Sequence, residues 1–443
     1  MGESKTHHGP DAVQRKAIAA AVAGCALEWY DFAVYGFFAL TISKLFFPSD
    51  EGSVSLLLGV ATFGVGFIMR PVGAIVLGSV ADRHSRSAAL SLTILLMVIG
   101  TAMIAFAPTY AQAGIWAPLM IVAARLIQGF SAGGEMGVAT ALLIESAPHS
   151  RRGLYGSWQQ VAQSTALLFG SGLGALLSST LTAAQMDEWG WRIPFMLGLV
   201  IGPIGWYIRR KLPEPEHASS EASVARRRAP LRSVLRDHRA ETVAGLGITT
   251  VWTVCSYFFL VYMPTYAATQ LQIELSSSLA SNAIGLVMLL VLAPLFGSLS
   301  DRWGRYRIIL VGIAGVLVTC YPAIVALQRV PSLGMLICVQ LWMAMLVAAI
   351  AGPAPAAMAE LFPQEVRSTG ISIGYNAAVV VFGGFAPLIA TWLIRVCQSG
   401  SAPAWYVSAS AALSLMALAW STRTIGAASR AKPIMPTAPD TPA

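Results

Sequence analysis

The sequence predicts an all-helical integral membrane protein with twelve transmembrane helices in two parallel six-helix halves. Three observations support this fold class: an apolar composition, long apolar segments that recur along the chain, and a pair of loop motifs that occurs twice. Of the 443 residues, 56% are hydrophobic and 11% are charged, whereas about 25% of an ordinary soluble domain is charged. Water is therefore not the main solvent of this chain.

The apolar segments are each at least about 18 residues long, which is enough to cross a hydrocarbon core about 30 Å thick. The first segment carries Glu28 and Asp31 and lacks a small-residue cleavage site. We therefore expect it to stay in the membrane and not to be removed as a signal peptide. The predicted segments are 17–40, 54–81, 88–107, 115–143, 154–180, 191–208, 242–267, 279–299, 308–327, 333–358, 368–394 and 405–422.

The basic residues predict the orientation of these segments. Most Lys and Arg residues fall in the two tails and in alternate loops, whereas the opposite loops hold only Lys44, Arg329 and Arg395. The positive-inside rule therefore predicts that both termini are cytoplasmic. We expect the protein to lie in the plasma membrane of a bacterium, that is, in the inner membrane. The net charge of +8 then reflects topology and contact with anionic lipid headgroups, and not nucleic-acid binding.

A polar stretch with two prolines and a Ser/Ala-rich run, residues 209–241, separates the sixth segment from the seventh. Its composition predicts a cytoplasmic linker between the two halves. The expected organisation is a cytoplasmic N-terminal tail (1–16), an N-terminal six-helix bundle (17–208), the linker (209–241), a C-terminal six-helix bundle (242–422) and a cytoplasmic C-terminal tail (423–443).

Two loop motifs occur once in each half. The pattern GxxxDRxxR stands at 78–86 and at 297–305, and ExxPxxxR stands at 145–152 and at 360–367. Both pairs recur in the same order, at nearly the same offset and on the same predicted side of the membrane. This repeat indicates two parallel halves that are related by an internal duplication.

The same motifs predict two breakable latches on the cytoplasmic face. Glycine permits close helix contact, and an aspartate at a helix end can face the positive N-terminus of a neighbouring helix. We expect arginines to reach the glutamate of the same half; the alternative is that these charges only set topology. The expected pairs are Arg83 and Arg86 with Glu145, and Arg302 and Arg305 with Glu360. The full predicted gate set is Asp82, Arg83, Arg86, Glu145, Asp301, Arg302, Arg305, Glu360 and Arg367.

Several classes of chemistry lack the residues they need. The five cysteines show neither CxxC nor metal-ligand spacing, so we expect no metal and no cofactor. No HExxH motif or Ser/His/Asp set marks a membrane enzyme, and no GxxxxGK[ST] loop marks a nucleotide-driven pump. All six histidines lie in tails or loops, so a carboxylate has to carry any proton that crosses the membrane.

Further motifs give the chain a family resemblance over nearly its whole length. They are EWYDF at 28–32, FP at 47–48, RPVG at 70–73, RLIQGFSAGGE at 125–135 and WGWRIPF at 189–195. With the loop motifs, they resemble the metabolite:proton symporter branch of the major facilitator superfamily. That resemblance implies the major facilitator fold, with helices 1, 4, 7 and 10 around a central cavity, and transport by alternating access.

The branch includes carriers of citrate, α-ketoglutarate, shikimate, phthalate, and proline or betaine. Residues 157–159, 264–266 and 382–387 are more similar to the organic-acid carriers. Two positions depart from the family pattern: Ser85 replaces a glycine that Gly304 keeps in the second half, and Cys25 replaces a common asparagine. We therefore expect a looser first latch, and we carry no substrate contact over to Cys25.

Charged residues inside a bilayer are functional candidates by default. Asp31 lies about 21 Å along the first helix and Arg125 about 15 Å along the fourth, so both fall near the midplane and could form an ion pair. Glu28 lies on much the same face as Asp31. The alternatives are that Asp31 and Arg125 form a permanent structural pair and that Glu135 serves helix packing or a gate. Arg70 is assigned to the inner gate.

The predicted proton-coupling residues are Asp31, Glu28 and Glu135. The second half offers polar and aromatic side chains to read substrate shape, although each aromatic residue could instead belong to the core or to the interfacial belt. The predicted substrate-binding set is Arg125, Gln128, Tyr35, Gln159, Tyr257, Tyr262, Gln340, Tyr375 and Asn376.

These parts suggest how transport is coupled. A substrate carboxylate would take over Arg125, and Asp31, left without its counter-ion, would bind a proton. The loaded carrier would then rock between outward and inward states. We expect a monomer that takes up a small organic acid together with protons. The alternatives are uptake of a zwitterionic osmolyte, facilitated diffusion or efflux on the same fold, and a transporter-like sensor.

Overall fold

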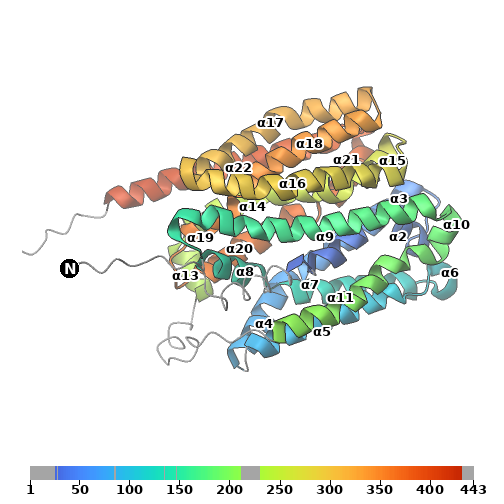
Figure 1. Ribbon diagram of the computed structural model, residues 1–443, viewed down its shortest axis with the longest axis horizontal. Coiled ribbons are helices and arrows are strands. Elements are labelled where there is room, and N and C mark those ends of the chain that lie inside the picture. The colour runs from blue at the N-terminus through green and yellow to red at the C-terminus, as the bar shows by residue number, and fades with distance from the viewer. Residues whose placement is uncertain are drawn as a thin grey trace, which may run out of the picture.

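The computed structural model describes residues 25–26, 28–83, 86–133, 135–145, 147–210 and 230–431, and this part of the chain contains helices and no strand. The helices run side by side along the long axis of the molecule (Figure 1). In the first half, residues 28–37 are helical and are followed by α2 (Ala39–Phe46), α3 (Gly52–Ile68), α4 (Arg70–Arg83), α5 (Arg86–Ala105), α6 (Tyr110–Ala113), α7 (Trp116–Ala132), α8 (Glu135–Glu145), η1 (His149–Arg151), α9 (Arg152–Thr180), α10 (Ala183–Gln185), η2 (Met186–Gly190) and α11 (Arg192–Arg210).

The second half has the same kind of architecture. Its elements are α13 (Pro230–Asp237), α14 (Arg239–Cys255), η4 (Ser256–Tyr262), α15 (Met263–Gln270), α16 (Leu275–Trp303), α17 (Arg305–Arg329), α18 (Leu333–Ala351), α19 (Ala354–Leu361), α20 (Arg367–Ala378), η5 (Val379–Gly383), α21 (Ala386–Cys397) and α22 (Ala402–Ala431). The predicted linker therefore includes the helix α13, α11 extends to Arg210, and residues 211–229 lie outside the described part.

Eight continuous helical stretches among the described residues are long and apolar enough to cross a membrane, and two shorter apolar helices, 91–105 and 116–132, accompany them. Counted as crossings, the described helices form twelve rods. These are 28–46, α3 with α4, α5, α7 with α8, α9, α11, α14 with η4 and α15, α16, α17, α18 with α19, α20 with η5 and α21, and α22. Twelve rods agree with the predicted segments.

Several rods are interrupted at residues that break a helix. The break between α3 and α4 falls at Met69, two residues before Pro71, and the break between α18 and α19 falls at Gly352 and Pro353. Proline lacks an N–H and clashes with the preceding turn, and neighbouring helices can satisfy the freed backbone groups. The first break matters for function because it places Arg70 at the start of a new helix segment.

Glycines bring α7 against α3 and α4 with backbone touching backbone. A Cβ atom added at Gly129 would meet the carbonyl oxygen of Gly66, and one added at Gly133 would meet the carbonyl oxygen of Arg70. Only glycine fits such a close approach of two helices. Arg125 lies one turn before Gly129, so this contact holds its side chain between the first helix and α3.

The two halves meet along several helix pairs. The longest such contact runs between α9 of the first half and α16 of the second, which lie next to each other in Figure 1. A Cβ atom at Gly153 on α9 would meet the carbonyl oxygen of Gly297 on α16, so these helices also touch at glycines. Gly297 is the first residue of the second GxxxDRxxR motif, which places that motif at the boundary between the halves.

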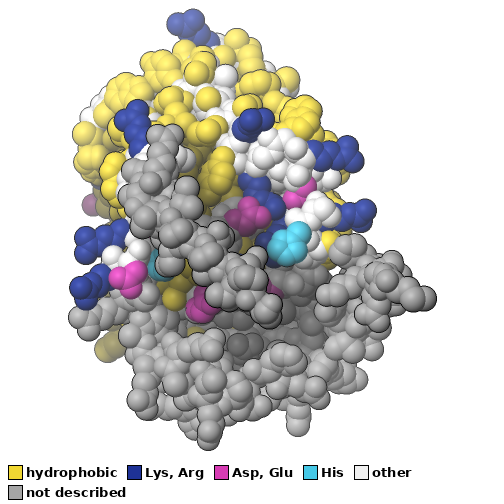
Figure 2. All heavy atoms as spheres, turned by 90° about the vertical axis from the view of Figure 1, so that its left-hand side faces the viewer, with side chains coloured by type: hydrophobic (Ala, Val, Ile, Leu, Met, Phe, Trp, Pro, Cys, Tyr) yellow, Lys and Arg dark blue, Asp and Glu magenta, His cyan; other side chains and the backbone are white. Residues whose placement is uncertain are grey.

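We call the end of the bundle that carries Glu145, Asp301 and Glu360 the motif end, and the other end, with Glu51 and Arg395, the opposite end. Figure 2 looks onto the motif end, where basic side chains are spread over the described part of the surface. Exposed arginines of the described part at this end are Arg151, Arg236, Arg239, Arg302, Arg307 and Arg423.

Candidate functional site

Arg125 is fully buried, with an exposed fraction of 0%. Its guanidinium carbon lies 4.5 Å from the ring centroid of Phe32, 4.5 Å from that of Tyr35 and 5.4 Å from that of Phe63. Its Nη1 atom donates to Oε1 of Gln128 at 2.8 Å. The aromatic rings therefore supply the buried cation with a favourable electrostatic environment.

The other two nitrogens of Arg125, Nε and Nη2, make no hydrogen bond to the described part of the chain. These two atoms form one edge of the planar guanidinium, and that edge matches the two oxygens of a carboxylate. A buried charge with unused donors is costly, so this edge is suited to a ligand that brings a carboxylate.

Asp31 is joined to Arg125 through two neutral side chains, and not by the direct ion pair that the sequence suggested. Thr101 of α5 donates its hydroxyl to Oδ2 of Asp31 at 2.7 Å, and Nε2 of Gln128 donates to the Thr101 hydroxyl at 3.0 Å. In the described part of the chain no ion pair links the two charged groups. We call the row Asp31, Thr101, Gln128 and Arg125 the relay.

Thr101 has two acceptors for one hydrogen. Its hydroxyl lies 2.7 Å from Oδ2 of Asp31 and 2.9 Å from the carbonyl oxygen of Met97, and it donates to one of them at a time. If Asp31 is ionised, the hydroxyl donates to Asp31. If Asp31 is protonated, the acid can donate to Thr101 and the hydroxyl can turn to Met97. Both protonation states therefore leave these groups hydrogen-bonded.

Glu28 pairs with Arg70. The Nη2 atom of Arg70 lies 3.3 Å from Oε1 of Glu28, and both side chains are largely buried. The guanidinium carbon of Arg70 lies 4.7 Å from the ring centroid of Phe67 and 4.9 Å from that of Phe32. Phe32 therefore contacts both buried arginines, and Arg70 belongs to the same cluster as Arg125.

Tyr257 reaches this cluster from the second half. Its ring stacks on Trp29 with centroids 5.8 Å apart, and it meets the rings of Phe63 and Phe67 edge-on at 5.8 Å and 5.2 Å. Two further predicted residues are buried but already engaged: Tyr35 donates its hydroxyl to the Gly59 carbonyl at 3.2 Å, and Gln159 accepts from Thr140 at 2.8 Å.

The remaining predicted substrate residues all come from the second half, and Tyr375 lies close enough to Arg70 and Tyr257 to interact with them electrostatically. Tyr262 shares a 2.7 Å hydrogen bond with Thr391, and Gln340 on α18 faces Gly285 on α16. Tyr375 packs edge-on against Trp252, with centroids 5.8 Å apart. Asn376 donates to the Gly133 carbonyl at 3.2 Å and thereby joins α20 to α7.

Four predicted side chains lie outside the described part: those of Glu135, Asp82, Arg83 and Arg86. Their backbone positions are known, because Glu135 begins α8, α4 ends at Arg83 and α5 begins at Arg86. The expected contact of the first-half arginines with Glu145 therefore stays a prediction.

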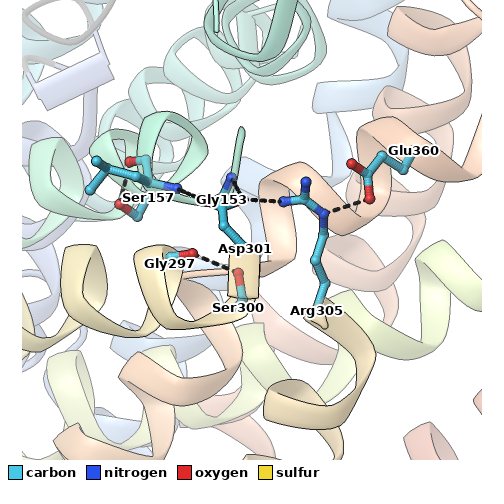
Figure 3. A network of polar contacts seen from close by, with 8 residues as sticks. Gly153, Ser157, Gly297, Ser300, Asp301, Arg305 and Glu360 are labelled. Carbon is cyan, nitrogen blue, oxygen red and sulfur yellow. Dashed lines mark hydrogen bonds and ion pairs between the residues drawn. The ribbon is translucent and has the colours of Figure 1, made fainter. Parts of the chain in front are cut away.

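The second-half motif forms the network of Figure 3. Asp301 accepts from the backbone N–H groups of Gly153 and Leu154, at 2.8 Å and 3.1 Å, and so caps the positive N-terminus of α9 in the other half. Arg305 lies between two carboxylates, with its Nη1 atom 3.2 Å from Asp301 and its Nε atom 2.5 Å from Glu360. The expected contact of Arg305 with Glu360 is present.

One gate residue differs from the expectation, and another makes a contact that was not predicted. Arg302 is exposed, and among the described residues no contact joins it to Glu360. The helical turn instead directs Arg305 toward that carboxylate. Glu145 accepts from Nη1 of Arg367 at 3.1 Å, and Arg367 also donates to the Ala359 carbonyl at 2.8 Å. This pair joins the two halves at the motif end.

Neutralising the Asp301 cap should loosen the motif end. For Asp301→Asn we expect a cysteine at Ser157, which is buried beside Gly297, to be modified about tenfold faster by a membrane-impermeant maleimide, because a charge at a helix terminus contributes up to about 2 kcal/mol. The matched control is Glu51→Gln, which removes the ion pair with Arg395 at the opposite end. If the cysteine at position 157 is modified at the same rate with Asp301→Asn as with Asp301 present, the result would contradict the latch.

The sequence alone did not identify Thr101, Phe32, Phe63 or Phe67. Thr101 is one of several small hydroxyl residues in an apolar helix, beside Ser91 and Thr93, so its type alone is a weak signal. Phe32 belongs to the EWYDF motif, which carries the family resemblance but assigns no role to this residue. The contacts between these aromatic rings and the arginines depend on which helix faces meet in space, and the sequence does not show that.

The comparisons with known proteins agree with this architecture. The family model described as sugar (and other) transporter matches residues 16–217 and again residues 214–423. The two matches confirm a repeated pair of halves. The fold is similar to that of a D-xylose-proton symporter, with a TM-score of 0.73 and 19% sequence identity over 91% of this chain and 96% of that one.

Curated relatives cover most of the chain. A citrate-proton symporter from Klebsiella pneumoniae is 36% identical over 401 residues, which are 90% of this chain and 90% of the relative. A proline/betaine transporter from Escherichia coli (strain K12) is 31% identical over 416 residues, which are 92% of this chain and 83% of the relative. The chain therefore belongs to the sugar (and other) transporter family, has the major facilitator fold, and is a multi-pass membrane transporter.

Proposed function

We propose that this protein takes up a small organic acid together with protons, by alternating access, across the inner membrane of a bacterium. The unused edge of the Arg125 guanidinium carries the proposal: two buried donors without a partner in the described part of the chain fit a carboxylate. Relatives that are citrate-proton symporters support both the acid and the proton.

The relay provides a route for coupling. A carboxylate bound at Nε and Nη2 neutralises the positive charge of Arg125. That charge then no longer stabilises the ionised form of Asp31. Asp31 then takes up a proton, and Thr101 turns its hydroxyl to Met97, which is 2.9 Å away. Substrate and proton therefore favour each other's binding, and this mutual preference is what symport requires.

The energetics of the membrane favour the same mechanism. Each negative charge that enters a negative-inside cell costs about 2.3 kcal/mol per 100 mV. A proton carried with each charge removes that cost, and each further unit of pH gradient adds about 1.4 kcal/mol, or about tenfold in accumulation. An uncoupled carrier would let an anion leave the cell.

The orientation and organisation of the chain form part of the proposal. We infer from the positive-inside rule that both termini lie on the cytoplasmic side, together with the motif end and its exposed arginines. The two bundles, 17–208 and 242–422, rock against each other about the arginine cluster as a monomer, and the linker connects them on the cytoplasmic side.

Uptake into liposomes tests this function directly. Purified protein is reconstituted, a pH gradient is imposed with the inside alkaline, and labelled citrate, α-ketoglutarate, phthalate, shikimate and betaine are offered in turn. We expect one of the acids to accumulate about tenfold per pH unit for each coupled proton, and to stop accumulating when an ionophore removes the gradient.

The same experiment separates the alternatives. Accumulation of betaine alone would favour the alternative hypothesis that the substrate is a zwitterionic osmolyte. The relatives named proline/betaine transporters are consistent with that alternative. Entry of an acid only to equal concentrations on both sides, with or without the gradient, would indicate facilitated diffusion and would contradict symport.

A further inference from the structure

The arginine cluster contains a second cation that the proposed chemistry does not use. Arg70 begins α4 and has an exposed fraction of 1%. Its guanidinium carbon lies 4.9 Å from the centroid of Phe32, and that of Arg125 lies 4.5 Å from the same centroid. The two guanidinium carbons are therefore less than about 9.4 Å apart, which is within the reach of one small molecule.

Arg70 is only weakly satisfied by Glu28. The contact that the described residues show between them is 3.3 Å long, whereas charged N–H to carboxylate hydrogen bonds are usually about 2.7–2.9 Å. The Nε atom of Arg70 has no hydrogen-bond partner within the described residues. Glu28 therefore leaves part of the donor capacity of this buried guanidinium unused.

A third unused group comes from the other half of the protein. The Tyr257 hydroxyl is buried and has no hydrogen-bond partner among the described residues. Its ring packs on Phe63, which contacts Arg125, and on Phe67, which contacts Arg70. Buried tyrosine hydroxyls normally find a partner, so this one is available to a polar ligand that lies among these rings.

We propose that Arg70 and Tyr257 form a second carboxylate subsite next to Arg125, so that the transporter selects acids with at least two carboxyl groups. This inference rests on the proposed function, because it takes the Arg125 edge as the first subsite. The second carboxylate binds Arg70 in competition with Glu28, and Tyr257 adds a hydrogen bond from the second half. A dianion held by both arginines also neutralises two buried cations at once.

This assignment differs from the inner-gate role that the sequence suggested for Arg70. A gate residue would contact the partner half only in one conformation and would not distinguish between ligands. A subsite residue contributes to the affinity for one class of ligand and not another. The two roles therefore differ in how selectivity responds to substitution.

The test compares glutarate, which has two carboxyl groups, with its monoamide glutaramate, which has the same chain and one carboxyl group. Both compete with the labelled acid that the uptake panel identifies. We expect the wild-type protein to bind glutarate at least about tenfold more tightly, since a hydrogen bond to a charged group is lost with the second carboxylate. Arg70→Gln should reduce this ratio to about one by weakening glutarate alone.

Glu28→Gln is the matched variant, and its predicted effect has the opposite sign. Removing the competing carboxylate frees Arg70, so glutarate should bind more tightly and glutaramate about as before. If the Arg70 and Glu28 pair were only structural, both variants would weaken both ligands alike, and that outcome would overturn the subsite.

Two further measurements keep the test interpretable. Arg70→Lys retains the positive charge near Glu28, so it should fold even where Arg70→Gln does not, and we expect it to reduce the glutarate preference at least threefold; an unchanged preference would overturn the subsite. Equal affinity of the wild-type protein for glutarate and glutaramate would also overturn the second subsite, but it would not contradict a carboxylate site at Arg125. Failure of the wild-type protein to bind or transport any acid of the panel would instead count against the proposed function.

Discussion

Replacing Arg125 by lysine is expected to raise the apparent KM for the acid substrate by about tenfold to a hundredfold, because hydrogen bonds to charged groups contribute about 1.5–3 kcal/mol each. Lysine keeps the charge but offers a point charge in place of the planar pair Nε and Nη2. It also loses the contact of Nη1 with Gln128, which connects the site to Asp31. Initial rates of labelled uptake over a range of substrate concentrations measure the effect.

The matched control for Arg125→Lys is Arg395→Lys. Arg395 lies at the opposite end and pairs with Glu51 at 2.6 Å, so its replacement by the same residue should change KM by less than about twofold, as is usual for an exposed ion pair. A normal KM for Arg125→Lys with every acid of the panel would remove the main support for a carboxylate at this position.

Asp31→Asn is expected to abolish the accumulation of substrate that a pH gradient drives. The variant should retain the exchange of labelled for unlabelled substrate. The asparagine oxygen can still accept the hydroxyl of Thr101, now 2.7 Å from Asp31, so the relay is kept and only the titratable charge is lost. With one pH unit imposed, the wild-type protein should accumulate substrate about tenfold per coupled proton, and the variant should reach only equal concentrations.

A purely structural role for Asp31 predicts a different pattern. Uptake and exchange would then fall together with thermal stability, since breaking a buried charged network costs about 3–5 kcal/mol. Normal gradient-driven accumulation by Asp31→Asn would exclude Asp31 as the proton carrier and move the role to Glu28 or Glu135.

The relay itself has a control pair at Thr101. Thr101→Val has a similar shape without the hydroxyl, so Asp31 and Gln128 each lose a partner, and the pH dependence of uptake should shift. Thr101→Ser restores the hydroxyl and should restore the wild-type pH profile. A profile that is the same for all three proteins would show that Thr101 does not couple Asp31 to the substrate.

Local sequence properties were enough to predict the class of fold. A segment rich in Leu, Val and Ala must form its backbone hydrogen bonds internally when lipid surrounds it, so the apolar segments predict helices without any knowledge of their neighbours. The loop motifs at 78–86 and 297–305 indicated the duplication, and the two family-model matches confirm it. The same reasoning identified Asp31, Arg125 and Glu28 as unusual, because charge inside a membrane is costly wherever it occurs.

What the sequence could not decide is which side chains meet. The rotation of each helix about its axis depends on packing between segments that are far apart in the chain, such as Gly129 against Gly66. This packing separates Asp31 from Arg125 by Thr101 and Gln128, and it brings Arg70 to the ring of Phe32.

The gate shows the same division. The residue types of the gate and its location in the loops followed from the sequence alone, because a repeated motif of acidic and basic residues beside a glycine can be recognised without a structure. The pairing of Glu145 with Arg367 and the capping of α9 by Asp301 join opposite halves of the chain. Contacts between halves depend on how the two bundles dock, and only the tertiary structure determines that docking.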